Sequence, residues 1–448
     1  MKVISLYYHS VTLDKDKCRG CTNCIKRCPT EAIRVRDGKA RIIPERCIDC
    51  GECIRVCPYH AKIAVTDPLS SINRFPYKIA LPAPSLYGQF KNLTDINRVL
   101  HGLKMMGFDD VFEVARGADY VTCFVKEYLK SSTVRPLISS ACPAIVRLIQ
   151  VRFPDLIDNI IPIESPMEVA AQIAKKEFCE KNGVPYDEVG AFFITPCAAK
   201  MTSIKSPIGL EQSSVDGAIS ILEVYGLLSN QIKKPDNDIK LQAASSVGVG
   251  WANSSGESVA LNIESYLAVD GIQNVIHVLE EIENNKFPDL DFFEGLACTG
   301  GCVGGPLTFE NSFVAKSRIK ALSKGLQHEY FPPDNLEDIR DSIKWHMEKR
   351  IVPKSIMKLD DDIALAIRKM DAIERLYDKL PGLDCGSCGS PNCRTLAEDI
   401  VQGEASELDC IFKLREKVKV LAGQMIELAE KIPTGKRDDA KGEKSQNE

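Results

Sequence analysis

The sequence predicts an α/β body flanked by two smaller cysteine-rich modules. From about residue 76, short apolar strands alternate with amphipathic helices, a pattern that builds a parallel sheet with helices on its faces. Twelve of the eighteen cysteines lie outside this body, eight before residue 65 and four after residue 384. With 448 residues, the chain has room for two or three domains of roughly 150 residues each.

The body, which we place at residues 76–345, takes its expected elements from apolar runs and from the helical period of 3.6 residues. A further helix is expected beyond it, at Asp361–Tyr377. The expected strands of the body are Lys78–Leu81, Ala191–Thr195 and Phe292–Ala297, and its expected helices include Ala144–Val151, Pro166–Lys176 and Gln273–Ile282.

Charge and hydropathy exclude some classes of binding partner. Lys and Arg number 57 against 62 Asp and Glu, and this net charge of -5 argues against a nucleic acid or an anionic membrane surface. No uncharged apolar run approaches the roughly 18 residues of a membrane helix, and residues 1–14 do not resemble a signal peptide. The cysteines cluster in short spacings typical of metal ligands, so we expect a reducing cytoplasm.

The first two cysteine runs both have the spacing C-x2-C-x2-C-x3-C-P, which is typical of bacterial ferredoxins with two 4Fe-4S clusters. We therefore place a ferredoxin-like α+β domain at residues 1–70, with a hairpin between the runs. Structural zinc sites are the alternative, but their cysteines come in two pairs rather than in fours. Since the fourth cysteine of each run ligates the other cluster, we assign Cys18, Cys21, Cys24 and Cys57 to one cluster and Cys47, Cys50, Cys53 and Cys28 to the second.

Four cysteines of the body lie just past candidate strands, where α/β sheets bind their ligands. Glycines beside Cys298 and Cys302, among them Gly300 and Gly301, let the backbone approach a bulky cofactor. Four such thiolates can surround one buried cubane. The four are Cys142, Cys197, Cys298 and Cys302.

Three motifs here resemble the catalytic domain of iron-only (FeFe) hydrogenases: Ser140–Pro143, Thr195–Lys200 and Ala297–Cys302, which stand in the family's order. The Ser165–Pro166 pair and the stretch WANSSGES match as well. The resemblance implies two doubly wound lobes with parallel sheets. It also implies that the four cysteines bind a cubane, with Cys302 bridging to a di-iron subcluster that carries CO, cyanide and a dithiolate bridge.

The resemblance further assigns catalytic and cofactor-binding residues. Lys200 would donate a charge-assisted hydrogen bond to a cyanide, although an exposed loop lysine is the alternative interpretation. The remaining residues expected to surround the cofactor are Ser165, Gly300, Gly301, Thr195 and Leu296.

Departures from the family pattern decide which kind of hydrogenase is expected. Ala141 stands where catalytic members carry a proton-relay thiol, and alanine cannot carry a proton. Ser203 replaces a relay glutamate, and the acidic pair on an earlier helix falls near Phe124 and Val125. Thr299 replaces a proline, and Thr195 and Leu296 replace methionines. A chain that keeps the ligands and lacks the relay resembles the sensory branch of the family, with slow hydrogen turnover.

Residues 355–410 form a third module, a small helical one that resembles the 4Fe-4S domain of corrinoid-protein and electron-transport subunits. A zinc knuckle is the alternative. Residues 411–432 have apolar positions in steps of three and four, the heptad spacing of a helix seam, and residues 433–448 should be disordered. The ligands of this third module are Cys385, Cys388, Cys393 and Cys410.

Three functions compete on this evidence: a hydrogen or redox sensor, a working ferredoxin-linked hydrogenase, and a non-catalytic iron-sulfur assembly factor, whose family also shows Ser-Ala-Cys-Pro. We favour the sensor because of Ala141. The expected partners are dihydrogen and protons, a redox protein such as ferredoxin, and a signalling protein or a second copy bound through residues 411–432, unless that helix packs on its own domain. Cys123 and Cys179 are expected to have no role.

Overall fold

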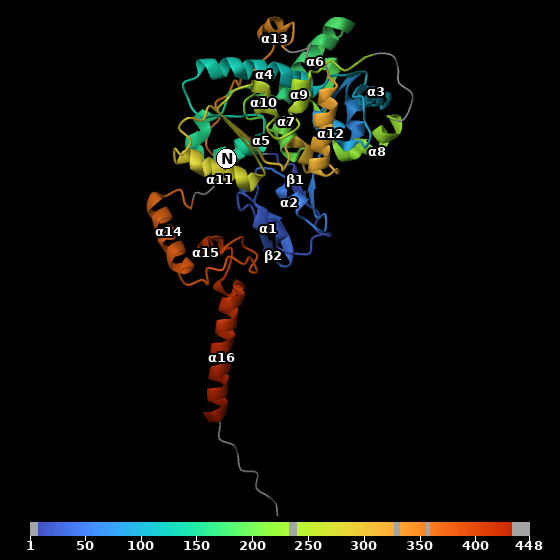
Figure 1. Cartoon of the computed structure of the whole chain (residues 1–448). Helices are drawn as coiled ribbons and strands as arrows, with labels where there is room; N and C mark the ends of the chain where they lie inside the picture. Colours follow the sequence, from blue (N-terminus) through green and yellow to red (C-terminus); the bar gives the residue numbers. More distant parts are fainter. Residues whose placement is uncertain (1–7, 233–239, 327–331, 355–358, 432–448) are drawn as a thin grey trace, which may run out of the picture. The chain divides into compact units, whose positions relative to one another are not determined.

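The computed structural model describes residues 8–232, 240–326, 332–354 and 359–431 (Figure 1). The chain divides into two compact units, Met1–Lys358 and Leu359–Glu448. The predicted disordered tail, 433–448, lies outside the described residues, as does Ile432 at the end of the predicted heptad helix.

The first lobe of the body is a parallel sheet of four strands in the order β6 (Asp110–Val111), β5 (Tyr77–Pro82), β8 (Val189–Thr195) and β9 (Gly217–Ser220). Successive residues of its central strands enter two different cores, because side chains alternate across a sheet. In β8, Ala191 and Phe193 pack with helices α4 (Val114–Ser131) and α6 (Pro166–Asn182), whereas Phe192 and Ile194 face α3 (Asn97–Met105) and α8 (Ile221–Gln231). Helices therefore cover both faces of this sheet.

The second lobe is a parallel sheet of three strands, in the order β10 (Tyr266–Asp270), β11 (Phe292–Leu296) and β7 (Leu137–Ile138). Helices α5 (Pro143–Arg152) and α11 (Ile272–Glu283) contribute to its core. Two parallel sheets with helices confirm the predicted α/β fold, and each strand and helix expected within the body is present. The last strand ends at Leu296, one residue early, because Ala297 already belongs to the cysteine loop.

The N-terminal module has the predicted ferredoxin-type α+β architecture. Its elements are the pair β1 (Val11–Leu13) and β4 (Lys62–Ala64), the short helices α1 (Asn23–Arg27) and α2 (Glu52–Arg55), and the antiparallel hairpin β2 (Ile33–Arg36) and β3 (Lys39–Ile42). The hairpin confirms the prediction for the segment between the two cysteine runs. The module packs within the same compact unit as the body.

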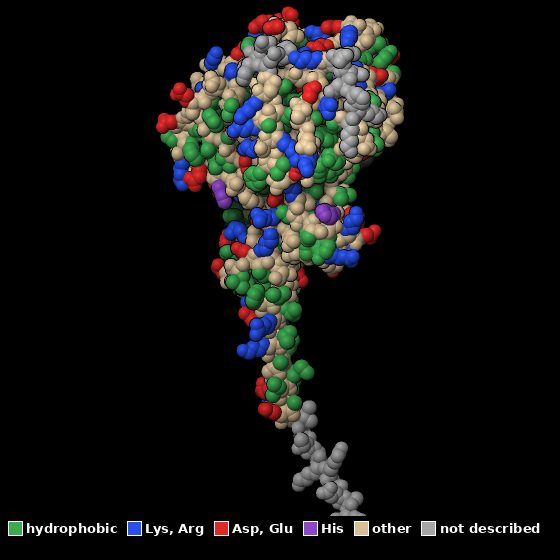
Figure 2. Space-filling view, turned by 45° about the vertical axis from the view of Figure 1, so that its right-hand side comes forward, with side chains coloured by type: hydrophobic (Ala, Val, Ile, Leu, Met, Phe, Trp, Pro, Cys, Tyr) green, Lys and Arg blue, Asp and Glu red, His purple; other side chains and the backbone are tan. Residues whose placement is uncertain are grey.

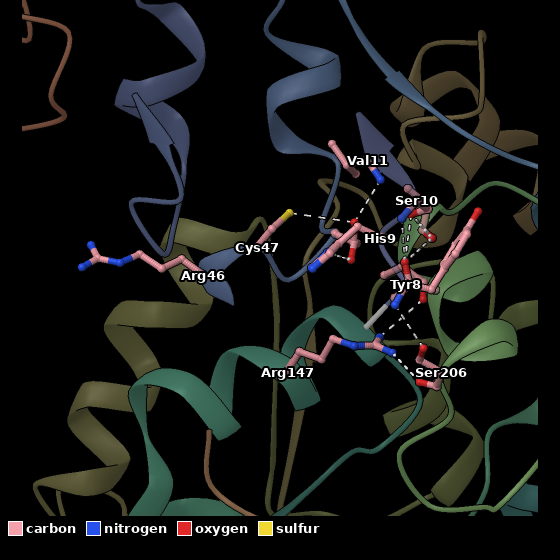
Figure 3. A network of polar contacts seen from close by, with 12 residues as sticks. Tyr8, His9, Ser10, Val11, Arg46, Cys47, Arg147 and Ser206 are labelled. Carbon is pink, nitrogen blue, oxygen red and sulfur yellow. Dashed lines mark hydrogen bonds and ion pairs between the residues drawn. The ribbon is translucent and has the colours of Figure 1, made fainter. Parts of the chain in front are cut away.

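A network of polar contacts joins the N-terminal segment to helix α7 (Ala198–Lys205) of the body (Figure 3). The Ser10 hydroxyl donates to the Ala198 carbonyl at 2.7 Å, and the Thr202 hydroxyl donates to Ser10 Oγ at 2.9 Å. On the module side, Asp49 accepts a hydrogen bond from the Val11 amide at 2.9 Å and contacts His9 Nδ1 at 2.9 Å. Buried, satisfied polar contacts of this kind fix the register of one module on the other.

The segment that follows the last body helix remains packed on the body beyond the expected boundary at 345. The Met347 amide donates to the Pro162 carbonyl at 2.9 Å, and the Lys354 amide donates to the Gln150 carbonyl at 2.8 Å. Ile351 is buried in the core of the second lobe.

The C-terminal unit contains α14 (Ile363–Tyr377), α15 (Cys393–Val401) and α16 (Ile411–Lys431). The first of these confirms the predicted helix over 361–377, with the Asp362 side chain capping its first turn. A small core gathers Ile373, Leu396 and Ala397. Within the described part of the chain, no helix combines the length and the apolar character needed to cross a membrane.

Truncating Phe192 should test the two-faced burial of the first sheet. Its ring is fully buried, so Phe192→Ala should lower the free energy of unfolding by about 3–5 kcal/mol through lost burial and the resulting cavity. Val259→Ala, at a side chain that is 64% exposed, is the matched control and should change it by less than about 0.5 kcal/mol. Urea unfolding of the two variants measures both values, and equal effects would contradict this packing.

Candidate functional site

The four body cysteines line one cavity. Cys142 occupies the N-cap position of the helix that follows β7, and Cys197 that of the helix that follows β8. Cys298 and Cys302 follow β11. They therefore come from the carboxyl ends of strands in both lobes, where parallel sheets bind ligands. Three separate segments of the sequence are brought together at this point.

The electrostatics of this cavity favour a bound cationic core. Burial, and then the neighbouring Cys298 and Cys142, raise the pKa of the Cys197 thiol to about 12. Desolvation, and then the neighbouring Cys142 and Cys298, also raise the pKa of the Cys302 thiol. Its side chain borders the cavity and is the most exposed of the four. Thiolates so close together repel one another unless cations separate them, and metal binding displaces their protons. The donor set therefore fits an iron-sulfur cubane.

Glycines shape the loop that carries Cys298 and Cys302. Gly301 has φ +96°, and a Cβ there would lie 2.4 Å from the Ser254 amide nitrogen. A side chain at position 301 would thus strain the backbone and push the loop out of place. Gly301 lines the cavity, whereas Gly300, whose carbonyl accepts a hydrogen bond from the Ser254 amide, does not.

The other residues that the sequence assigns to the cofactor divide into two groups. Lys200 and Leu296 line the cavity, and Lys200 is half-buried in the first turn of α7 rather than in an exposed loop. Ser165 and Thr195 do not line it. Ser165 instead precedes α6, whose first residues Pro166 and Met167 form part of the wall, and Thr195 Oγ1 accepts a hydrogen bond from the Cys197 amide at 3.0 Å.

The positions to which the sequence resemblance assigns a proton relay carry no acidic group and no thiol. Ala141 lies on the cavity wall. The Ser203 hydroxyl accepts a hydrogen bond from the guanidinium of Arg147 at 3.1 Å. Phe124 and Val125 are buried in the apolar core around α4.

A second set of polar residues, which the sequence did not single out, lies beside Ala141. Ser139 Oγ donates to Glu257 at 2.5 Å and accepts a hydrogen bond from the Ala141 amide at 3.2 Å. Glu257 and Glu294 both line the cavity and are almost fully buried. Burial and the neighbouring Glu294 raise the pKa of Glu257, and burial raises the pKa of Glu294. The pair therefore holds a proton at neutral pH.

A sequence signal for these carboxylates exists in hindsight. Glu294 interrupts an otherwise apolar strand, and a charge inside a buried strand needs a partner or a function. Glu257 lies in the family-like stretch WANSSGES. Neither signal shows that the two carboxyls meet across the fold.

The eight cysteines of the N-terminal module line two small cavities. Lys62 borders the first cavity, and its buried ammonium has no hydrogen-bond partner among the described residues. A buried ammonium without a partner is costly, so an anionic cluster beside it fits the site. Cys18, Cys21, Cys24 and Cys57 line the first cavity, and Cys28, Cys47, Cys50 and Cys53 line the second.

Arg55, in helix α2, connects the N-terminal module to the central cavity. Its guanidinium donates to the carbonyls of Gly304 at 2.9 Å and Ala297 at 3.4 Å, and it pairs with Glu52. It also lies beside Cys298, where its positive charge opposes the effect of burial, which raises the pKa of that thiol. Sequence reasoning missed this residue because its two carbonyl partners in the body lie more than 240 positions away.

In the C-terminal unit, three of the four predicted ligands belong to one small core. Cys393 and Cys410 are buried and Cys388 is half-buried, while Cys385 is exposed. The Cys393 amide donates to Asp384 at 2.7 Å, which fixes the start of α15. Cys123 and Cys179 lie in α4 and α6 and do not line any of the three cysteine cavities.

Comparison with known families agrees with this geometry. The model described as "Iron only hydrogenase large subunit, C-terminal domain" matches residues 77–262 and 233–306, which together cover half of the chain. The chain belongs to the iron-only hydrogenase family. A 4Fe-4S dicluster model matches residues 10–58 of this hydrogenase-family chain, and an Fe-S cluster model matches residues 380–412. It is thus an iron-sulfur protein.

Individual relatives of this hydrogenase-family chain are distant. The periplasmic [Fe] hydrogenase large subunit of Nitratidesulfovibrio vulgaris is 26% identical over 366 residues, which cover 66% of this chain and 86% of the relative. The cytosolic Fe-S cluster assembly factor NAR1 of Yarrowia lipolytica is 24% identical over 142 residues, covering 30% and 29%. A solved structure of a variant of the apo [FeFe]-hydrogenase HydA1 from Chlamydomonas reinhardtii aligns with a TM-score of 0.47 at 16% identity, over 65% of this chain and 97% of that one.

Removing the charge of Arg55 should change the reduction potential of a cubane held by the central cysteines. A cation near Cys298 stabilises the reduced, more negative cluster, so Arg55→Gln should lower the reduction equilibrium constant about tenfold, or about 59 mV for a one-electron couple. A redox titration followed by electron paramagnetic resonance measures this shift in protein without a di-iron subcluster. Arg55→Lys keeps the charge and is the control; an equal shift in both variants would contradict the electrostatic role.

Proposed function

We propose that this member of the iron-only hydrogenase family senses hydrogen or redox state and turns dihydrogen over slowly. One observation supports the proposal: four cysteines, Lys200 and Ala141 line the same cavity. By the family resemblance, Ala141 stands where catalytic members carry the relay thiol. Ligand retention favours a hydrogen-reactive cofactor. Loss of the relay favours slow exchange of protons, which typically costs about a hundredfold or more in rate.

The cofactor assignment extends this proposal. Cys142, Cys197, Cys298 and Cys302 would hold a cubane, with Cys302 also bridging a di-iron subcluster that carries CO, cyanide and a dithiolate bridge. When bound, that group supplies the site at which dihydrogen is formed or cleaved. Lys200 is suited to donate a charge-assisted hydrogen bond to a cyanide, because its ammonium borders a largely apolar cavity.

Proton handling would fall to Ser139 and Glu257. Because its pKa is raised, Glu257 holds a proton at neutral pH, and the Ser139 hydroxyl links that carboxyl to the backbone at Ala141. The methyl group of Ala141 offers no donor on the final step toward the cavity. A proton would therefore need an ordered water to complete the path, which supports slow rather than absent turnover.

Electron supply would fall to three further 4Fe-4S clusters, two in the N-terminal module and one bound by Cys385, Cys388, Cys393 and Cys410. Cys50, which lines the second N-terminal cavity, packs against the same core as Cys142 and Cys197. That cavity is accordingly suited to be the inner electron site, with the exposed Cys21 marking the outer one. A redox protein such as ferredoxin is the electron partner we propose, and a signalling protein or a second copy would read the state.

Two alternatives are each favoured by one observation. A working hydrogenase is favoured by the contact of Ser139 with Glu257, which offers a proton group despite Ala141. An assembly factor is favoured by the similarity to NAR1 over 142 residues. The two complete sets of four cysteines around N-terminal cavities count against the assembly factor, because electron carriers imply a site that uses electrons.

Hydrogen turnover of the matured protein tests the sensory proposal. We expect evolution at least about a hundredfold slower than that of a relay-bearing hydrogenase assayed in parallel, and Ala141→Cys should raise it by restoring an ionisable group at the wall. Ala118→Cys, at another alanine of the same wall, controls for an added thiol. A wild-type rate equal to that of the relay-bearing enzyme would contradict the sensory assignment.

Glu257→Gln should remove the residual proton supply. Its carboxyl loses its proton as pH rises through its raised pKa, so we expect wild-type turnover to decrease at alkaline pH. The variant should be at least about tenfold slower and should lack this alkaline decrease. Rates measured between about pH 5 and 10 decide this. Retention of both the wild-type rate and its pH profile in the variant would show that protons travel elsewhere.

A further inference from the structure

Helix α16 leaves a continuous apolar face exposed. It spans 21 residues, begins directly after the predicted ligand Cys410, and contains no buried side chain. Figure 2 shows hydrophobic side chains along it. Phe412, in its first turn, packs against the small core of its own unit, but it is not a seam residue. Its six described seam residues are between 46% and 71% exposed: Ile411, Leu414, Val418, Leu421, Met425 and Leu428.

The identity of these residues indicates how many helices would pair. In a heptad, Ile411, Val418 and Met425 take position a, and the three leucines take position d. β-branched residues at a with leucine at d favour parallel, two-stranded coiled coils over trimers and tetramers. The face is therefore complementary to itself: a second copy in register stacks like residues in alternating layers.

The flanking positions allow the same arrangement. In a parallel pair, position g of one helix faces position e of the other, so Lys417 would face Ala422 and Gln424 would face Ala429 of the second copy. Neither pair places like charges together, and the small alanines leave room for the lysine stem to cover the seam. Other charges are paired within the helix itself, as in the contact of Lys431 with Glu427 at 2.6 Å.

We propose that α16 pairs with the α16 of a second copy of this chain in a parallel coiled coil. The pairing brings the two Cys410 residues to the same end of the seam, so the two C-terminal cysteine modules would lie next to each other. A change in the state of one module could then alter the pairing of both chains. The dimer itself depends on the helix sequence alone and stands or falls independently of hydrogen chemistry.

Two neighbouring substitutions test the seam against a matched control. Leu421 and Val420 are 46% and 55% exposed and adjacent in α16, yet only Leu421 is a seam residue. Sedimentation velocity of the full, cluster-loaded chain over about 1–100 µM should give twice the 49.5 kDa mass of the chain. Leu421→Glu should yield the monomer, and Val420→Glu should leave the dimer intact. A wild-type monomer across this range, or equal behaviour of both variants, would overturn the proposal.

A distance measurement tests the orientation. A spin label attached at position 430 through a non-cysteine handle reports the separation between the two copies. In a parallel pair the labels lie across the width of the coiled coil, whereas an antiparallel pair separates them by roughly the ~30 Å length of a 21-residue helix. A separation set by that length would overturn the parallel arrangement.

Discussion

Everything in the body depends on the convergence of four cysteine side chains on one cavity. Cys142, Cys197, Cys298 and Cys302 come from strand ends in two different sheets, and burial raises the pKa of at least three of these thiols. Four thiolates so close together repel one another, and four neutral thiols would bind no ligand. The set is therefore suited to cations that occupy the space between the sulfur atoms. The parallel sheets, the glycine loop and the helix caps all place sulfur at this point.

Two positively charged side chains of the N-terminal module also lie beside cysteines. Arg55 reaches from α2 to the loop that carries Cys298, and the ammonium of Lys62 is buried next to the first N-terminal cavity. Each is a positive charge beside sulfur atoms that would carry negative charge in a cluster. Because module and body form one compact unit, the geometry between electron carriers and the central site is built into the fold.

Local patterns predicted much of this arrangement, and tertiary contacts account for the rest. Periodicity placed β8 and α6, and the cysteine spacings identified the sets that line each cavity. The contact of Ser139 with Glu257 joins residues 118 positions apart, so no spacing could reveal it. Packing on the body continues past 345, because Ile351 is buried in a core to which distant helices contribute. Charge inside an apolar strand, as at Glu294, is a local signal of a buried polar site.

The central claim is that these four cysteines hold a single iron-sulfur core that extends into a di-iron subcluster. An infrared spectrum of the matured protein tests it most directly, because CO and cyanide absorb where protein does not. The account predicts CO and cyanide bands, with the cyanide bands shifted in Lys200→Ala. A spectrum without such bands, from protein whose N-terminal clusters are fully loaded, would contradict it.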